Sequence, residues 1–370
     1  MSDIRYFGVG CLIPRISAEN VDEWLKKTKK HLEAIPSVHQ LSFTGITDIN
    51  YSWRGGEIGQ LGDEKLNIPE AGTLSFKVHI PTRLRTKLGA PLGSDDVEDF
   101  YVFTFFSHVH PVTYVSFLDS TGEVRAPAAA VIIVREFLNA ELQKTEPKVD
   151  LIRIGPTPFH ADFFLSPGNG VIDIMDGFSY SRKKQPGYDR IEYFYTREDE
   201  RSAISADEAL ASLYLITKQE FSYFYHFESL RNARGRAMAE LYMDAARLAE
   251  RFKKKGIKHY LYRAFALGHR LQSAQLEAIS ARMLVTWHKR NAKENLDRLY
   301  GSTESVGIKE HLEKVSEEDF IEDIEASEKI LEIIEGRHSQ EVQRFATISF
   351  SLLGVIVGAV LTAAFRGWWG

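Results

Sequence analysis

The chain has 370 residues, of which 44% are hydrophobic and 26% are charged, the balance of an ordinary globular protein with room for two or three domains. Its mild formal net charge of −5 excludes a general electrostatic affinity for nucleic acid. Cys11 is the sole cysteine, which excludes an intrachain disulfide and fits a reducing compartment.

Residues 1–200 predict a cytoplasmic α+β domain. Amphipathic or alanine-rich spacing predicts helices over residues 19–34 and 127–143. Apolar, β-branched and aromatic runs predict strands over residues 6–12, 41–53, 74–80, 100–106, 112–117, 151–154, 160–165 and 191–195. The first residues carry no basic region followed by a long apolar stretch, so we expect no signal peptide and a cytoplasmic location for this domain.

Residues 201–309 predict a helical domain built from long basic helices. Ser205 and Glu208 form a capping-box pattern at its start. Proline is absent from there to Tyr300, and the stretch after Gly256 predicts one helix that reaches about residue 300. Residues 310–344 predict an acidic stalk helix, with a start at Ser316 because acidic residues follow it in the first turn.

Charge is sorted between these two segments. Residues 231–300 hold 16 Lys and Arg against 6 Asp and Glu, whereas residues 310–336 hold 2 against 11. This contrast predicts antiparallel packing of the two segments, within one chain or between chains; two independently solvated surfaces are the alternative. A third interpretation is an anion site for a nucleotide or lipid headgroups. Its candidate residues are Arg251, Lys253, Lys254, Lys255 and Lys258.

Residues 345–365 form an uncharged apolar run of 21 residues, FATISFSLLGVIVGAVLTAAF. As a helix the run is about 31 Å long, which matches the hydrocarbon core of a bilayer. Arg344 and Arg366 bracket it, and a short tail over residues 366–370 holds a Trp pair suited to the headgroup layer. The sequence therefore predicts a tail-anchored, single-pass membrane protein, in the inner or plasma membrane if the source is bacterial.

The membrane run also predicts association of copies. Gly354 and Gly358 form a GxxxG pattern that Ser351 and Thr362 extend. Small residues four apart let helix backbones approach closely in lipid. We therefore expect a homo-oligomer, and the uncharged run excludes a proton or ion relay through a single copy.

Two sets of residues are candidates for chemistry. Imidazoles and a carboxylate at a spacing of two residues are suited to a divalent metal; strand-end residues with ordinary hydrogen bonds are the alternative. These residues are His108, His110, His160 and Asp162. We expect no cofactor.

Two Arg-x5-His elements form the second set, Arg263 with His269 and Arg282 with His288. They are similar to the Arg-x4–6-His element of HEPN ribonucleases, helical proteins that cleave RNA as dimers. The resemblance implies an acid–base role for His269 or His288 and a phosphate-binding role for Arg263 or Arg282. Nucleic acid is a partner only under this alternative.

The order of segments resembles that of CorA-type divalent-cation channels, in which a cytoplasmic α/β domain and long helices lead into the membrane. The stretch Gln340-Glu-Val-Gln-Arg-Phe-Ala-Thr-Ile348 is similar to the junction where the stalk of that family enters its first span. The Gly-Met-Asn signature and the second span of the family have no counterpart here, since Arg366-Gly-Trp-Trp-Gly370 follows the run. The resemblance implies an architecture and carries over no ion-selectivity residue.

These patterns predict a non-enzymatic effector in which a cytoplasmic domain senses a protein or nucleotide ligand and passes that state to a bundle of membrane helices. A membrane-held ribonuclease and a passive membrane scaffold are the alternatives.

Overall fold

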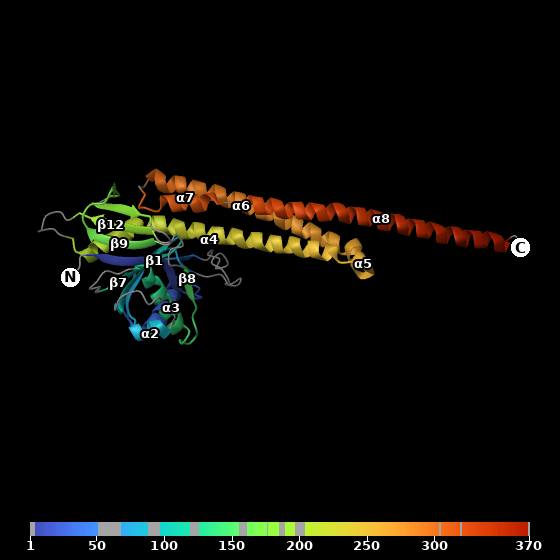
Figure 1. The fold of residues 1–370 in the computed structure, drawn as a ribbon. Helices are drawn as coiled ribbons and strands as arrows, with labels where there is room; N and C mark the ends of the chain where they lie inside the picture. Colours follow the sequence, from blue (N-terminus) through green and yellow to red (C-terminus); the bar gives the residue numbers. More distant parts are fainter. Residues whose placement is uncertain are drawn as a thin grey trace. The chain divides into compact units, whose positions relative to one another are not determined.

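The chain folds into two compact units, which we describe separately. The computed structural model describes residues 4–50, 68–87, 97–118, 126–154, 161–175, 177–184, 189–196, 204–302, 305–318 and 320–368. The first unit comprises Met1–Asn232 and Ala292–Glu317, and the second comprises Ala233–Asn291 and Glu318–Gly370. Two long helices contribute residues to both units (Figure 1), so the helical segment expected over residues 201–309 is divided between them.

The first unit is built on a mixed sheet in the order β10-β11-β12-β9-β1-β7-β6-β5-β2, to which β8 adds by pairing with β1. The pair β9–β12 is parallel, and the other pairs are antiparallel. The strands of this sheet are β1 (Arg5–Pro14), β2 (Val38–Thr44), β5 (Ala71–His79), β6 (Asp99–Ser107), β7 (Val112–Phe117), β8 (Leu151–Ile154), β9 (Ala161–Pro167), β10 (Ile172–Asp173), β11 (Phe178–Lys183) and β12 (Asp189–Tyr195). A separate small pair joins β3 (Ile49–Asn50) to β4 (Ile68–Pro69).

Helices α1 (Val21–Glu33) and α3 (Ala129–Leu142) cover one face of this sheet, and a short helix α2 (Thr82–Lys87) follows β5. Trp24 and Leu32 of α1 join Val131 and Phe137 of α3 in one buried cluster with the sheet. Gly8 permits the close approach of α3 to β1, since a Cβ at this position would lie 2.7 Å from Cγ2 of Val131. The predicted helices at residues 19–34 and 127–143 are therefore confirmed as α1 and α3.

Helical segments cover the other face of the sheet. The first part of α4 (Ala206–Lys253), the last part of α6 (Leu267–Ser302) and helix α7 (Lys309–Glu317) supply buried residues to a second cluster. Tyr114 of β7 stacks on Tyr214 of α4 with ring centroids 4.1 Å apart. The predicted capping box at the start of α4 is confirmed, since Glu208 N–H donates to Ser205 Oγ at 3.2 Å and Ser205 N–H donates to Glu208 Oε2 at 2.9 Å.

The second unit packs α4, α6 and the final helix α8 (Ile321–Trp368) against one another around a shared apolar cluster. The cluster includes Leu241 of α4, Ala278 of α6 and Leu331 of α8, all buried. A nine-residue helix, α5 (Ile257–Phe265), connects α4 to α6. Figure 1 shows α8 continuing alone past α5 toward the C-terminus.

Two predicted helix boundaries are wrong. The single helix expected after Gly256 is broken at Ala266 into α5 and α6. Ser316 does not start the last helix, because it lies near the end of α7, where its hydroxyl donates to the carbonyl of Glu313. The strand predicted over residues 41–53 is represented by the end of β2 and by β3, and residues 51–53 lie outside the described part of the chain.

Candidate membrane-proximal site

Helix α8 contains the apolar run, and most of the described side chains of that run are exposed. Within the described residues it is the one helix long and apolar enough to cross a membrane. Its large apolar side chains between residues 350 and 361 are each more than half exposed, from 51% at Val357 to 74% at Phe350. Burying a large apolar side chain of this kind contributes roughly 1.5–3 kcal/mol relative to leaving it in water, so contact of this surface with an apolar environment is favourable.

The helix surface directly before this segment is packed against α5 and α6. A Cβ at Gly268, in the first turn of α6, would lie 3.3 Å from Nε2 of His338, so glycine permits the close approach of α6 to α8. Half-buried Phe345 and Ser349 show that packing on one side of α8 continues into the start of the apolar segment. The turn between α4 and α6 therefore lies beside the place where α8 becomes bare.

Arg263 of α5 is the polar centre of this junction. Its Nε donates to Glu341 Oε2 of α8 at 2.7 Å, and Nη1 donates to the carbonyls of Phe252 at 3.2 Å and Lys254 at 2.7 Å. The guanidinium also lies 5.4 Å from the centroid of the Phe252 ring. One side chain thus joins the end of α4, α5 and α8, one turn before the apolar segment.

Opposite charges pair along α6 and α8. Arg282 of α6 contacts Glu328 at 2.6 Å and Glu325 at 3.8 Å. Neutral Gln275 of α6 also donates to Glu335 at 2.7 Å. Contacts at later α6 residues are made with earlier α8 residues, so the two helices are antiparallel. The predicted packing of the basic and acidic segments is confirmed within one chain. Because most of these groups are half exposed, each pair contributes about 1 kcal/mol or less.

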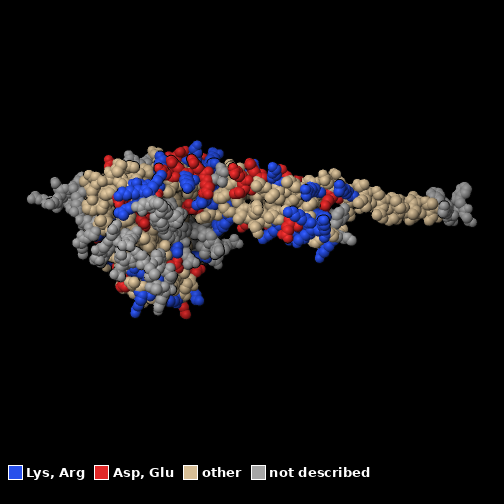
Figure 2. Space-filling view, viewed as in Figure 1, with Lys and Arg blue, Asp and Glu red and all other residues tan. Residues whose placement is uncertain are grey.

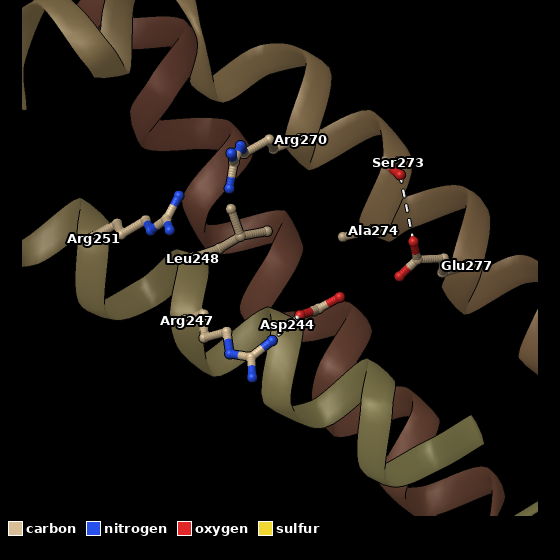
Figure 3. A pocket seen from close by; sticks show the side chains of 8 residues that line it. All are labelled: Asp244, Arg247, Leu248, Arg251, Arg270, Ser273, Ala274 and Glu277. Carbon is tan, nitrogen blue, oxygen red and sulfur yellow. Dashed lines mark hydrogen bonds and ion pairs between the residues drawn. The ribbon is translucent and has the colours of Figure 1, made fainter. Parts of the chain in front are cut away.

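A cleft of about 310 Å³ opens between α4 and α6 near the same end of the unit (Figure 3). It is lined by Asp244, Arg247, Leu248 and Arg251 of α4 and by Arg270, Ser273, Ala274 and Glu277 of α6. Asp244 accepts from Arg247 at 3.1 Å, and the hydroxyl of Tyr262 accepts from Arg251 at 3.3 Å. Arg270 is exposed and makes no ion pair within the described part of the chain.

The predicted anion-binding residues surround the turn next to this cleft. Lys253, Lys254, Lys255 and Lys258 are exposed at the end of α4 and the start of α5. Lys254 lies 3.7 Å from Glu250. Figure 2 shows the basic residues gathered at this end of the helical unit, next to the uncharged length of α8. Sequence reasoning missed Arg270, which lies 19 residues after Arg251, because only the turn of the chain brings the two together.

Two of the predicted metal ligands, His110 and Asp162, are engaged in structural contacts. His108 and His110 lie in the connection between β6 and β7 rather than on a strand. Buried His110 has its Nδ1 2.8 Å from the carbonyl oxygen of Pro111, and its ring stacks on Tyr225. Asp162 accepts from the Ala128 N–H at 3.0 Å. His160 lies outside the described residues, among which no cluster of three or more metal-ligating side chains occurs.

The two Arg-x5-His elements have different environments. Arg263 is bound to Glu341 while His269 is exposed on the first turn of α6, across the break at Ala266. Arg282 is bound to Glu328, whereas His288 is buried. In both elements the guanidinium that would hold a phosphate therefore contacts a carboxylate of α8.

A buried carboxylate in the first unit was not predicted. Glu220 of α4 accepts from the Tyr300 hydroxyl, from Ser305 Oγ at 3.0 Å and from the Val306 N–H at 3.0 Å. Burial raises the pKa of Glu220, and these hydrogen bonds oppose that rise. The group fixes the connection between α6 and α7. A single glutamate within a predicted helix does not indicate that Glu220 is buried or that it binds a distant connection.

No family model, no curated protein sequence and no solved structure matches this chain. The resemblances to CorA-type channels and HEPN ribonucleases therefore stay predictions.

Proposed function

We propose that this chain is a single-pass membrane protein that oligomerises and couples a cytoplasmic α+β sensing domain to a bundle of membrane helices, acting as a channel-like or membrane-perturbing effector. The observation that carries this proposal is the continuity of α8 over 48 residues. Its first part is anchored in the second unit by buried Ile324, Leu331 and Ile334. Its last part is bare and apolar, so a shift of the packed part moves the membrane part.

Association of copies is supported by the small-residue side of α8. Ser351, Gly354, Gly358 and Thr362 lie between about 140° and 220° around the helix from half-buried Ser349, at about 100° per residue. This side therefore faces away from α5. A Cβ at Gly354 or Gly358 would meet no atom within 4 Å, so a second helix has open access.

A second apolar surface supports the same conclusion. Large side chains of α6 at spacings of three and four residues share one face and are 54–68% exposed. They are Leu276, Ile279, Met283 and Trp287. Exposed apolar patches of this kind mark interaction surfaces.

The orientation follows from charge around the start of the span. The sequence alone places Lys329, Arg337 and Arg344 before the run against Arg366 after it. The fold adds the lysines of the α4–α5 turn, because Arg263 holds that turn beside Glu341. Basic residues next to a span favour the cytoplasmic side, which supports a cytoplasmic location for the bulk of the chain.

Cysteine crosslinking in native membranes tests the assembly. Cys11 is buried, and burial raises its pKa, so the wild-type thiol is unreactive and serves as the background. Ser351→Cys and Thr362→Cys should give disulfide-linked dimers under mild oxidation, whereas Ile356→Cys and Val360→Cys on the opposite side should not. Equal crosslinking at all four positions, or at none, would overturn the proposed interface.

Reconstitution distinguishes an effector from a passive scaffold. Liposomes that hold the wild-type chain should release an entrapped dye or ion, and replacement of residues 345–365 by an equally long Leu-Ala span should abolish release. If the wild-type chain inserts and releases nothing, with candidate cytoplasmic ligands present or absent, the effector proposal fails and the chain acts as an anchor.

A further inference from the structure

The turn between α4 and α6 carries a cluster of positive charge close to the start of the apolar run of α8. Exposed Lys253, Lys254, Lys255 and Lys258 lie within six residues, and Glu250 is the one carboxylate that pairs with them in the described structure. Lys253, Lys255 and Lys258 have no ion-pair partner among the described residues. We call these four lysines the basic turn. Neighbouring lysines repel one another, and an anion bound at this surface relieves that repulsion.

The depth of the basic turn follows from the Arg263 contact. Glu341 lies four residues before Phe345, which corresponds to about 6 Å along a helix. The headgroup layer extends about 5–8 Å beyond the hydrocarbon core on each side. When the apolar run occupies the core, Arg263 is therefore level with the headgroups. The adjoining lysines, linked to it through the carbonyl of Lys254, lie at the same surface.

The cleft beside the basic turn provides a more specific receptor. Asp244 accepts from Arg247, and Glu277 Oε1 accepts from the Ser273 hydroxyl at 3.4 Å. Arg251 and Arg270 are directed into the cleft (Figure 3). Counting Arg247, Arg251 and Arg270 against Asp244 and Glu277 leaves one net positive charge. A Cβ at Gly268 would meet His338, seven residues before Phe345, so Gly268 lies about 10 Å before the apolar run. Because α6 is antiparallel to α8, Arg270 lies about 3 Å farther from the run, within a side-chain length of the headgroup layer. A guanidinium pair at that depth has the geometry and charge for a phosphodiester.

We infer that the basic turn and the arginine cleft bind the headgroups of anionic phospholipids in the bilayer that holds the span of the same chain. The inference rests on the proposed membrane insertion and adds a lipid specificity to it. Phosphate is the recognised group. The lipid source is favoured over a free nucleotide because the basic turn lies at headgroup depth next to the bare segment of α8, and the cleft opens beside that turn. Polybasic surfaces beside a span are typical anionic-lipid sites.

Native mass spectrometry of the full chain in neutral detergent tests the inference. The protein is incubated with phosphatidylglycerol or phosphatidylcholine of matched acyl chains, and retained lipids are counted. The wild type should retain phosphatidylglycerol preferentially. A triple variant, Lys253→Gln, Lys255→Gln and Lys258→Gln, should reduce that retention by up to about 100-fold, since each cation near a membrane surface contributes about a factor of five.

Two further variants sharpen the test. Arg251→Ala with Arg270→Ala should lower retention while leaving circular dichroism unchanged, because Arg270 has no ion-pair partner among the described residues. The matched control removes three exposed lysines of α1, with Lys26→Gln, Lys29→Gln and Lys30→Gln, and should retain lipid as the wild type does. Equal loss in this control would show a net-charge effect and overturn the inference.

The remaining outcomes separate the inference from the proposed function. Competition by millimolar inorganic phosphate as strong as that by phosphatidylglycerol would assign the cleft to a free phosphate ligand and overturn the lipid source. Equal retention of both lipids would also overturn the inference, although insertion would stand. Failure of the wild type to co-float with neutral liposomes would instead refute membrane insertion itself.

Discussion

Removal of the Arg263 side chain should release α5 from α8 without unfolding the rest of the chain. Arg263→Ala deletes the contact with Glu341 and the two hydrogen bonds to the carbonyls that end α4. These three contacts converge on a single guanidinium, so one substitution removes all of them.

The size of the effect follows from the contacts. A hydrogen bond to a charged group contributes about 1.5–3 kcal/mol. The lower end applies to the Glu341 contact, because the side chains of Arg263 and Glu341 are 12% and 26% exposed. The two carbonyl contacts add about 1.5 kcal/mol together, for a total near 3 kcal/mol. A free-energy difference of that size changes a local opening equilibrium about 100-fold.

Hydrogen exchange measured by mass spectrometry on the full chain in neutral detergent is the assay. Peptides that cover α5 should exchange about 100-fold faster in Arg263→Ala, and Arg263→Lys should be intermediate because it keeps the charge and loses the guanidinium geometry. Arg270→Ala is the matched control, and peptides of β1 report the integrity of the first unit. An α5 exchange rate within threefold of wild type would refute the assignment of Arg263 as the link.

Three further predictions concern other parts of the molecule. Glu220→Ala leaves the Val306 N–H and two hydroxyls without their acceptor and should lower the free energy of unfolding in urea by about 3 kcal/mol, with a smaller loss for Glu220→Gln. Burial lowers the pKa of His110 to about 3 and that of His226 to about 4, so their contribution is complete above pH 6.5 and is lost as the pH falls toward those values. Urea unfolding should therefore show about 2 kcal/mol less stability per histidine at pH 5 than at pH 7.5, and His226→Gln should reduce the difference. The raised pKa of Glu220 acts in the opposite direction, since its contribution is complete below about pH 4.5 and declines as the pH rises, so a more stable chain at pH 5 would contradict the histidine assignment. Gly354→Ile and Gly358→Ile meet open space in one copy and should weaken self-association about tenfold in analytical ultracentrifugation without changing helix content; unchanged association would exclude this side of α8.

Local patterns predicted the elements that depend on local chemistry. The capping residues Ser205 and Glu208 mark the start of α4, and runs of aromatic and β-branched residues mark β6 and β7. The opposite charges of the two helical segments predicted their antiparallel contact, which Arg282 and Glu328 make. These features can be predicted from sequence because each depends only on neighbouring residues or on the net charge of a segment.

Other features depend on residues distant in the chain. No proline marks the break at Ala266. At this break the chain reverses direction, and α6 then packs back along α4 and α8. The acidic pattern at Ser316 resembles a helix start, yet α7 ends there. Arg251 and Arg270 line one cleft only after that turn forms, and the partners of Glu220 lie 80 or more residues away. The spacing of these residues in the sequence therefore does not predict their contacts.

The small-residue side of α8 and its packed side lie on opposite surfaces of one helix. In any assembly that closes through Gly354 and Gly358, α8 is consequently the innermost helix, and α4 and α6 stand on the periphery. Exposed Ile333 of α8 lies on the same inward side. A passage along the axis of such an assembly would therefore be lined by α8 alone. The arginine clefts would open outward toward surrounding lipid.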